Sequence, residues 1–248
     1  MKTIVIAAGY ATRLYPLTEN FPKPMLEIGK STILDRLLDD IDTIPEVDGH
    51  IVVTNHKFAG IFRKWAEKRP NVTILDDGTS TNETRLGAVR DLILALETFG
   101  IDEDILVVAA DNILDFSLRG FVEEFRRRGT SMIMCHHEPE IYKLQRTGVI
   151  EVDENMRVLQ MQEKPQAPVS HWAVPPFYIY RREDLPLIHT SIACGCGFDA
   201  PGNLAHYLVD KTIVHAWPMP GARFDIGSLD TYEEARRRYA AQRIAEKS

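Results

Sequence analysis

No segment of this chain stays apolar over the roughly 20 residues that a membrane-spanning helix requires. The apolar run in the opening MKTIVIAAG is too short to be the core of a secretory signal followed by a spanning helix. The sequence therefore predicts a cytoplasmic protein without a membrane partner.

Positive charge is also in short supply. The 248 residues include 29 lysines and arginines against 36 aspartates and glutamates, which gives a formal net charge of -7. This balance disfavours a broad basic surface, which is the electrostatic footprint of nucleic-acid binding. We expect no nucleic-acid partner, and an anionic substrate would need a local group of cations or a metal ion.

Cysteine is scarce, with Cys135, Cys194 and Cys196 as the three thiols. Three thiols cannot all pair, and Cys-Gly-Cys is poor geometry for a bridge. A zinc site would need further ligands, and only the scattered His189 and His206 lie near in sequence. Reduced thiols are therefore predicted, and a zinc site is disfavoured.

Two familiar phosphate-binding motifs are missing. A dinucleotide fingerprint requires G-x-G-x-x-G, but Ala11 and Leu14 follow Gly9 where two further glycines should stand. The sequence Gly29-Lys30-Ser31 looks like the tail of a Walker A loop, yet Pro24 takes the place of its first glycine. Ser31, or the next residue, is better interpreted as a helix N-cap with Asp35 in the first turn.

What is present is an ordinary globular composition. Hydrophobic residues make up 44% and charged residues 26%, both near the average for soluble domains. The length fits one large domain or two small ones, and no repeat, low-complexity segment or linker is visible. We therefore predict a single domain over residues 1–248.

Short apolar runs alternate with amphipathic segments in the first half of the chain. The spacing predicts strands at 3–8, 51–54, 72–75 and 105–110, and helices at 31–41, 58–68 and 85–99. Such alternation implies right-handed crossovers and a parallel sheet covered on both faces.

The rhythm changes after about residue 130. A hairpin turning around residues 153–155 indicates antiparallel strands, so the sheet should become mixed. Later segments predict helices at 182–189, 200–209 and 229–244 and a strand at 213–217. The predicted fold class is α/β, a doubly wound, Rossmann-like mixed sheet.

The loop after the first strand, Ala7-Ala8-Gly9-Tyr10-Ala11, is the first place to look for chemistry, because open parallel sheets bind ligands at the carboxyl ends of their strands. Small side chains let backbone N–H groups face a phosphate or a base edge. The alternative is a tight turn in which Gly9 serves only its φ angle.

Two isolated cations follow this loop. Arg13 comes just beyond it, and Lys23 stands between Pro22 and Pro24. A following proline pushes a residue out of the helical region, so Lys23 is predicted to be extended on a stiff segment. That arrangement would preorganise an ammonium for an anion. The alternative is a surface lysine in a proline-rich turn.

Two carboxylates occupy comparable positions later in the chain. Asp111 ends the run ILVVAAD beside Asn112, and Asp225 precedes a glycine and a helix start. Either pair of oxygens suits a divalent metal on a nucleotide's phosphates. The alternative for both is the capping of a turn or a helix. Glu163 and Lys164, before Pro165, repeat the lysine-proline arrangement, although an exposed ion pair is the commoner meaning.

Taken together, these segments resemble the sugar-1-phosphate nucleotidylyltransferase family, in its single-domain, glucose-1-phosphate thymidylyltransferase-like form. The resemblance spans most of the chain. The segments that carry it are AAGYATRLYPLTENFPKPML, AADN, TGVIEVD, EKP, VPPFYIY and FDIGSLDTYEEA. It implies the nucleotide-diphospho-sugar transferase fold and the transfer of NMP from an NTP to a phosphorylated acceptor, most often a sugar 1-phosphate, with release of pyrophosphate.

The resemblance also implies roles for individual residues. The nucleotide-binding residues would be Ala7, Ala8, Gly9, Tyr10, Ala11, Asn82 and Gly87. The catalytic cations would be Arg13 on the β- and γ-phosphates, Lys23 on the α-phosphate and Lys164 on the acceptor phosphate. The remaining acceptor residues would be Gly148, Glu163 and Tyr178, and the Mg²⁺ ligands Asp111 and Asp225.

Three departures from the family pattern leave the substrates open. Ala11 stands where many members have glycine, Arg223 replaces an aromatic residue of the thymidylyltransferase branch, and residues 79–85 are not that branch's base-reading sequence. The nucleobase is therefore not predicted, nor is the choice between monomer and homo-oligomer. A phosphocholine- or phosphonate-type cytidylyltransferase and a non-catalytic nucleotide-sugar sensor stay as alternatives.

Overall fold

The computed structural model describes the backbone of residues 1–245 and the side chains of residues 1–239. The strands are β1 (Lys2–Ile6), β2 (Glu27–Ile28), β3 (Ser31–Thr32), β4 (Gly49–Thr54), β5 (Val72–Asp76), β6 (Ile105–Ala109), β7 (Asn112–Leu114), β8 (Ser131–His137), β9 (Gly148–Val152), β10 (Val158–Glu163), β11 (Trp172–Val174), β12 (Phe177–Tyr180), β13 (Val214–Pro218) and β14 (Arg223–Asp225).

The helices lie between these strands. The α-helices are α1 (Ile33–Ile41), α2 (His56–Ala66), α3 (Ala88–Phe99), α4 (Arg119–Arg128), α5 (Ile141–Leu144), α6 (Leu185–Thr190), α7 (Pro201–Val209) and α8 (Leu229–Ala245). The 3-10 helices are η1 (Thr12–Leu14), η2 (Lys23–Met25), η3 (Asn82–Thr84) and η4 (Arg182–Asp184). None of the described helices is both long enough and apolar enough to cross a membrane.

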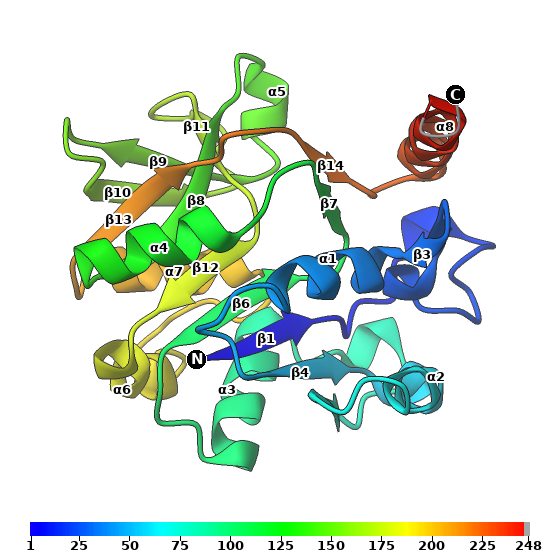
Figure 1. Cartoon of the computed structure of the whole chain (residues 1–248). Coiled ribbons are helices and arrows are strands. Elements are labelled where there is room, and N and C mark those ends of the chain that lie inside the picture. Colours follow the sequence, from blue (N-terminus) through cyan, green and yellow to red (C-terminus); the bar gives the residue numbers. More distant parts are fainter. Residues whose placement is uncertain (246–248) are drawn as a thin grey trace.

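One sheet of 10 strands organises the molecule. Figure 1 shows its central strands running between the helices. Its strands follow the order β10-β9-β11-β8-β12-β6-β1-β4-β5, with β13 paired to β8. The neighbours β6, β1, β4 and β5 are parallel, whereas β12 runs antiparallel to both β6 and β8. The predicted mixed α/β sheet is confirmed, and its parallel half is the part with strand-helix alternation in the sequence.

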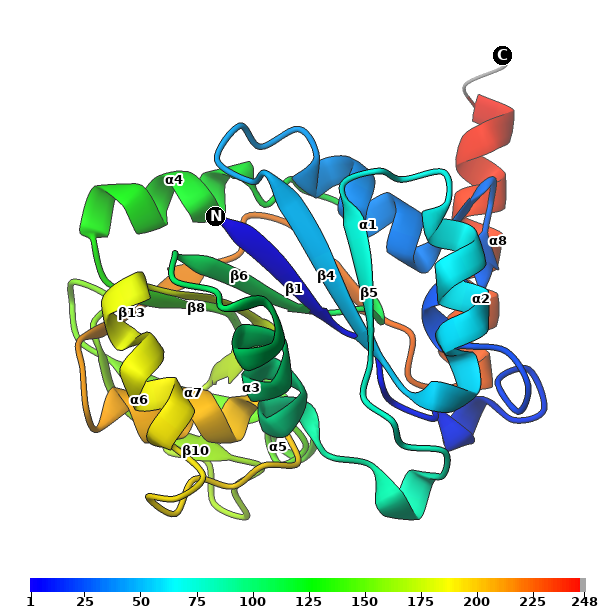
Figure 2. The same ribbon diagram turned by 90° about the horizontal axis from the view of Figure 1, so that it is seen from below.

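Helices cover both faces of this sheet (Figure 2). Apolar residues of α1, α2 and α4 pack with Val5, Val52 and Val108 on one face. Residues of α3, α6 and α7 pack with Ile4 and Val107 on the other. Because neighbouring residues of a buried strand point to opposite faces, each central strand contributes to both cores.

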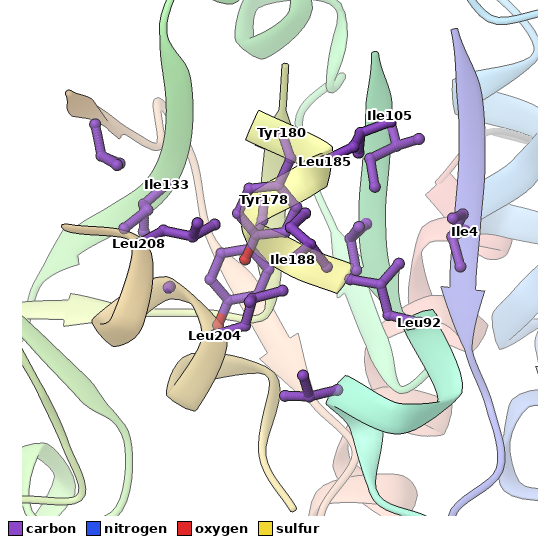
Figure 3. Close-up of a cluster of buried hydrophobic side chains, with 14 of the residues drawn as sticks. Ile4, Leu92, Ile105, Ile133, Tyr178, Tyr180, Leu185, Ile188, Leu204 and Leu208 are labelled. Carbon is purple, nitrogen blue, oxygen red and sulfur yellow. The ribbon is translucent and has the colours of Figure 1, made fainter. Parts of the chain in front are cut away.

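Two tyrosines of β12 anchor the second core, as the close-up in Figure 3 shows. The rings of Tyr178 and Tyr180 stack with their centroids 5.9 Å apart and their planes at 9°. Both side chains are buried, among residues that include Ile188 of α6 and Leu204 and Leu208 of α7. This packing holds α7 against the carboxyl-terminal half of the sheet.

A small second sheet was not predicted. β7 and β14 pair antiparallel, with Asn112 opposite Asp225, and lie between the main sheet and α8 in Figure 1. The predicted helix at 85–99 was also too long, because residues 82–84 form η3 and α3 begins only at Ala88, after Gly87 with a φ of 92°. The other predicted elements are confirmed to within a few residues, including the hairpin of β9 and β10.

The start of α1 confirms the predicted N-cap. Thr32 is the cap: the backbone N–H of Asp35 donates to Thr32 Oγ1 at 2.9 Å, and the N–H of Thr32 donates to Asp35 Oδ2 at 3.3 Å. Two N–H groups that the helix leaves unpaired are thereby satisfied. The sequence Gly29-Lys30-Ser31 is therefore a turn before a helix and not a phosphate loop.

This cap yields a stability prediction. Thr32→Ala removes the acceptor for the Asp35 N–H and should lower the free energy of unfolding by about 1 kcal/mol in urea titration. Thr43→Ala is the matched control, because the exposed Thr43 hydroxyl only donates to Asp40 O beyond the end of α1. Equal losses in the two variants would contradict a capping role.

Candidate active site

The loop after β1 leaves its backbone open. Ala7 continues the parallel pairing, with its N–H donating to Val53 O at 2.9 Å, and Ala8 O accepts from Asn55 Nδ2 at 2.9 Å. Gly9 is exposed, and a Cβ built there would have nothing within 4 Å. Gly9 does not adopt a positive φ. A φ requirement therefore does not explain this glycine, whereas room for a ligand does.

Tyr10 and Ala11 depart from the expectation of a uniform backbone loop. The Tyr10 side chain is buried against Phe58, with ring centroids 6.2 Å apart, so it supports the loop from below. Ala11 has φ 48° and ψ 42°, which is the left-handed region. A residue with a Cβ loses about 1–2 kcal/mol there relative to the right-handed region. A glycine, which the family resemblance implies at this position, would avoid this cost.

Lys23 differs from its predicted conformation, and its surroundings exclude the surface-lysine alternative. It is not extended: it opens η2, because Leu26 N donates to Lys23 O and Met25 N donates to Pro22 O, each at 3.0 Å. These two bonds outweigh the steric cost of a helical residue before proline. The surface-lysine alternative is also wrong, because the Lys23 side chain is only 13% exposed and its Nζ donates to Asp111 Oδ2 at 2.7 Å.

Asp111 and Asp225 are brought together by the pairing of β7 with β14. Asp225 lies opposite Asn112, and Ile226 N donates to Asp111 O at 3.0 Å. The Asp225 carboxyl reaches solvent, but the protein around it removes part of its hydration, and this raises its pKa. The negative charge of Asp111 raises it further. The two carboxylates therefore form one electrostatic unit.

Neither carboxylate acts as a cap. At the start of α8 the N–H of Thr231 donates to Ser228 Oγ, and Thr231 Oγ1 accepts from the N–H groups of Gly227 and Ser228. Asp225 is therefore not needed there. The Asp111 carboxylate accepts only side-chain donors in the described structure.

Asn112 links this acidic pair to a further cation, which sequence reasoning did not assign. Its Nδ2 donates to Asp111 Oδ1 at 2.6 Å, and its Oδ1 accepts from Arg223 Nη1 at 2.5 Å. Lys23 Nζ also donates to Ile226 O at 2.9 Å. A continuous set of hydrogen bonds thus runs from Lys23 through Asp111 and Asn112 to Arg223. Only the strand pairing reveals it.

A second group of predicted residues surrounds Glu163 at the end of β10. A Cβ built on Gly148 would lie 3.3 Å from Glu163 Oε2, and one built on Gly202 would lie 2.0 Å from the same atom. Burial raises the pKa of Glu163. Burial and then the charge of Glu163 raise the pKa of Tyr178. Gly202, at the start of α7, was not predicted, because its contact with Glu163 is tertiary.

Among the described residues, Lys164 pairs with Glu163 and forms no ion pair with Asp111 or Asp225. Its φ is 49°, so the predicted extended conformation before Pro165 is wrong. The side chain is 55% exposed, and Nζ lies 3.8 Å from Glu163 Oε1. This is the exposed ion pair of the simpler interpretation. Arg13 is exposed as well, and its charge opposes the rise in the Asp225 pKa that burial and Asp111 cause.

Asn82 and Gly87 lie on one surface loop before α3. Asn82 begins η3, and Gly87 is buried with its would-be Cβ 2.5 Å from Phe198 O. The first N–H groups of α3 donate to the loop that contains Phe198, as Ala88 N does to Asp199 O at 3.1 Å. Only a glycine fits this close approach, so Gly87 is fixed by packing as well as by its positive φ.

Asp91, one turn into α3, is a buried carboxyl that the sequence did not single out. It is 3% exposed, and its Oδ1 has no hydrogen-bond partner among the described residues. Burial raises the pKa of Asp91 to about 7, and the nearby Asp77 contributes in the same direction. The folded protein therefore favours the protonated form of this group.

The sign of this shift gives a pH prediction. Because the folded state binds a proton that the unfolded state releases above about pH 4, Asp91 stabilises the fold at low pH and loses this contribution as pH rises through 7. In urea titrations at pH 5 and pH 8, wild type should lose about 2–3 kcal/mol relative to Asp91→Asn. Asp230→Asn, which removes an exposed carboxyl, should show no such difference. A pH-independent offset for Asp91→Asn would contradict the raised pKa.

Protein ligands for a metal are few. Within the described part of the chain, no group of three or more His, Cys, Asp or Glu side chains is placed to hold a metal ion. A metal at Asp111 and Asp225 would therefore take its other ligands from substrate and water.

The three thiols, of Cys135, Cys194 and Cys196, are free in the structure, as the sequence predicts.

Comparisons with known proteins point to one family. The family model described as "Nucleotidyl transferase" matches residues 2–242. The UTP–glucose-1-phosphate uridylyltransferase AglF of Haloferax volcanii is 26% identical over 247 residues, and the match covers 96% of each chain. The glucose-1-phosphate adenylyltransferase of Fervidobacterium nodosum is also 26% identical, and the match covers 93% of this chain and 59% of that relative.

A solved structure gives the same result for the fold. UDP-glucose pyrophosphorylase complexed with UDP-glucose matches with a TM-score of 0.80 at 18% identity, over 97% of this chain and 98% of that one. The predicted nucleotide-diphospho-sugar transferase fold is thereby confirmed. Because the family model spans nearly the whole sequence, this chain belongs to the nucleotidyl transferase family.

Proposed function

We propose that this protein transfers NMP from an NTP to a sugar 1-phosphate and releases pyrophosphate. One observation carries the proposal: Lys23, Asp111 and Asp225 converge at the carboxyl edge of the parallel strands, next to a loop with an open backbone at Gly9. Transfer of this kind brings anionic groups together, so a cation and metal-binding carboxylates at one point are what the reaction needs.

The nucleotide half of the site lies along β1 and α3. We assign the backbone of residues 7–11, with Asn82 and Gly87, to the nucleoside and its phosphates. Arg13 would hold the β- and γ-phosphates, and its exposure leaves it free to turn toward them. Lys23 would contact the α-phosphate that is attacked. No covalent intermediate is required, because the acceptor phosphate is itself the nucleophile.

The carboxylates Asp111 and Asp225 fit Mg²⁺. They offer hard oxygen ligands, and burial together with the negative charge of Asp111 raises the pKa of Asp225. Mg²⁺ is commonly held by one or two carboxylates together with substrate phosphates and water, and this matches the two protein ligands available. The ion would neutralise phosphate charge during transfer. Lys23 and Asn112 keep the Asp111 carboxylate oriented through their hydrogen bonds.

The acceptor half is assigned to the residues around Glu163. Its partly buried carboxylate suits hydroxyl donors of a sugar, with Gly148 and Tyr178 shaping the site around it. Lys164, exposed beside Glu163, would reach for the acceptor phosphate. The two relatives named above are named for glucose 1-phosphate but for different nucleotides, so their names support the acceptor class and not one nucleobase.

The direct test is pyrophosphate release from a panel of substrates. ATP, CTP, GTP, UTP and dTTP would each be combined with glucose 1-phosphate, mannose 1-phosphate and phosphocholine in the presence of Mg²⁺. Turnover with a sugar 1-phosphate supports the proposal. Turnover with phosphocholine alone would replace it by the cytidylyltransferase alternative, and nucleotide binding without any turnover would favour a sensor.

The carboxylate pair provides the first variant. Asp111→Ala should lower the rate of pyrophosphate release at least about 100-fold, because an electrostatic contact to the transferring group is lost. Asp102→Ala is the matched control: Asp102 lies before the opposite end of the same strand, β6, where it pairs with Arg182 on the surface. Full activity in Asp111→Ala would refute the assigned role.

Gly202 provides the second variant. Gly202→Ala places a Cβ where Glu163 Oε2 now lies, so the carboxylate has to move. We expect the KM for the sugar 1-phosphate to rise about tenfold or more while the KM for the NTP stays within twofold, because a polar contact of about 1.5–3 kcal/mol is displaced. Gly60→Ala in α2, where a Cβ meets nothing within 4 Å, is the control. Equal rises in both KM values would speak against an acceptor-specific effect.

A further inference from the structure

Arg223 is a half-buried cation whose surroundings are incomplete. On β14, Nη1 donates to Asn112 Oδ1 at 2.5 Å. Its Nε is enclosed and has no hydrogen-bond partner. Among the described side chains, no carboxylate oxygen lies within 4.0 Å of the guanidinium, which distinguishes Arg223 from arginines such as Arg69 and Arg181.

An arrangement of this kind is costly without a ligand. Buried donors are nearly always paired, and a charge removed from water is usually neutralised by a partner. The neutral amide of Asn112 accepts one hydrogen bond but supplies no charge. An unmet donor on a permanently charged group at a functional site indicates that an anion belongs there.

The position of Arg223 places this anion on the acceptor side. Arg223 and Asp225 are two residues apart on one strand and point to the same face, whereas Phe224 points away to pack under α8. Four residues before Arg223, Met219 N donates to Cys135 O of β8 at 2.9 Å, and β8 is joined through β11 to Gly148 of β9. Arg223 therefore lies on the side of Asp225 from which the chain comes from β8, toward the strands that carry Gly148 and Glu163.

A neighbouring histidine supplies no competing charge. His136 of β8 has an enclosed Nδ1 without a partner. Burial lowers the pKa of His136 to about 4, and the charge of Arg223 lowers it as well, so the imidazole is neutral near pH 7. Arg223 is thus the permanent cation of this part of the site. Its charge opposes the rise in the Asp225 pKa, but it forms no ion pair within 4.0 Å with a carboxylate of the described residues.

We propose that Arg223 binds an oxyanion of the acceptor substrate and so selects acceptors by charge. The inference rests on the proposed function above, which it makes more specific. A guanidinium offers parallel N–H donors that match two oxygens of a phosphate or a carboxylate. An aromatic residue at this position, as in the thymidylyltransferase branch that the sequence resembles, would provide no such group.

Two sources of the oxyanion share this chemistry. One is the 1-phosphate that every such acceptor carries, and the other is a second acidic group on the acceptor, such as a sugar carboxylate. Glucose 1-phosphate and glucuronic acid 1-phosphate separate them, because the second compound adds only a carboxylate. The comparison is made under identical NTP and Mg²⁺ concentrations.

The test measures KM and kcat for wild type, Arg223→Gln and Arg223→Lys. We expect Arg223→Gln to raise the acceptor KM about 10- to 100-fold, as for a lost charge-assisted hydrogen bond, with the NTP KM within twofold of wild type. Arg223→Lys should recover part of the affinity, which a purely structural role would not predict. An equal rise for both acceptors identifies the phosphate, and a rise confined to the glucuronic compound identifies the second acid.

The control is Arg238→Gln in α8, which removes a guanidinium from the other face of β14. Arg238 stacks over the Phe224 ring at 4.2 Å and is not part of the proposed site. An unchanged acceptor KM in Arg223→Gln, with wild type active, would overturn the inference and leave the proposed function standing. So would a rise in the NTP or Mg²⁺ requirement alone, because it would place the effect at Asn112 and Asp111.

A binding measurement covers an enzyme that is inactive with the panel. Calorimetric titration of glucose 1-phosphate and glucuronic acid 1-phosphate should show weaker binding of at least one of them to Arg223→Gln than to wild type. If wild type neither turns over nor binds either compound, both the proposed function and this inference fail.

Discussion

The hydrogen-bonded ion pair of Lys23 with Asp111 is the interaction on which the rest of the site depends. Through Nζ, Lys23 also holds Ile226 O, so one ammonium joins segments that are 88 and 203 residues apart in sequence. Burial and then the negative charge of Asp111 raise the pKa of Asp225, and the charges of Arg223 and Lys23 oppose this rise. The Lys23 ammonium thus holds the segments of Asp111 and Ile226 together where the site forms.

The residues around Glu163 are held in place by close packing. Gly148 and Gly202 approach Glu163 from two elements, and a side chain at either position would meet its carboxylate or the Met161 methyl group. The stacked ring of Tyr178 supports the same region from the core below. Because cores are close-packed, this support leaves the carboxylate few alternative positions. Packing thus fixes the residues around Glu163, whereas hydrogen-bonded charges fix those around Asp111.

The predictable features are those that follow from local pattern. Strand-helix alternation gave the parallel half, and the rule that ligands bind at carboxyl edges placed Asp111 near the loop of Gly9. Individual roles came from the family resemblance and not from periodicity. Asn112 and Gly202 were missed because their contacts join residues far apart in sequence. The predicted conformations of Lys23 and Lys164 were wrong, because hydrogen bonds and turn geometry override the preference of a residue before proline.

The loop of Phe198 and Asp199, before α7, contacts both the proposed nucleobase residues and the proposed acceptor residues. Phe198 O and Asp199 O accept the first N–H groups of α3, directly after Gly87. Arg85 donates to the Asp199 carboxylate at 2.9 Å, which connects the segment of residues 82–87 to this loop a second time. Three residues after Asp199 the chain reaches Gly202 and the contact with Glu163. A shift of this loop would therefore move residues 82–87 and the surroundings of Glu163 together, which couples the proposed nucleobase residues to the proposed acceptor residues.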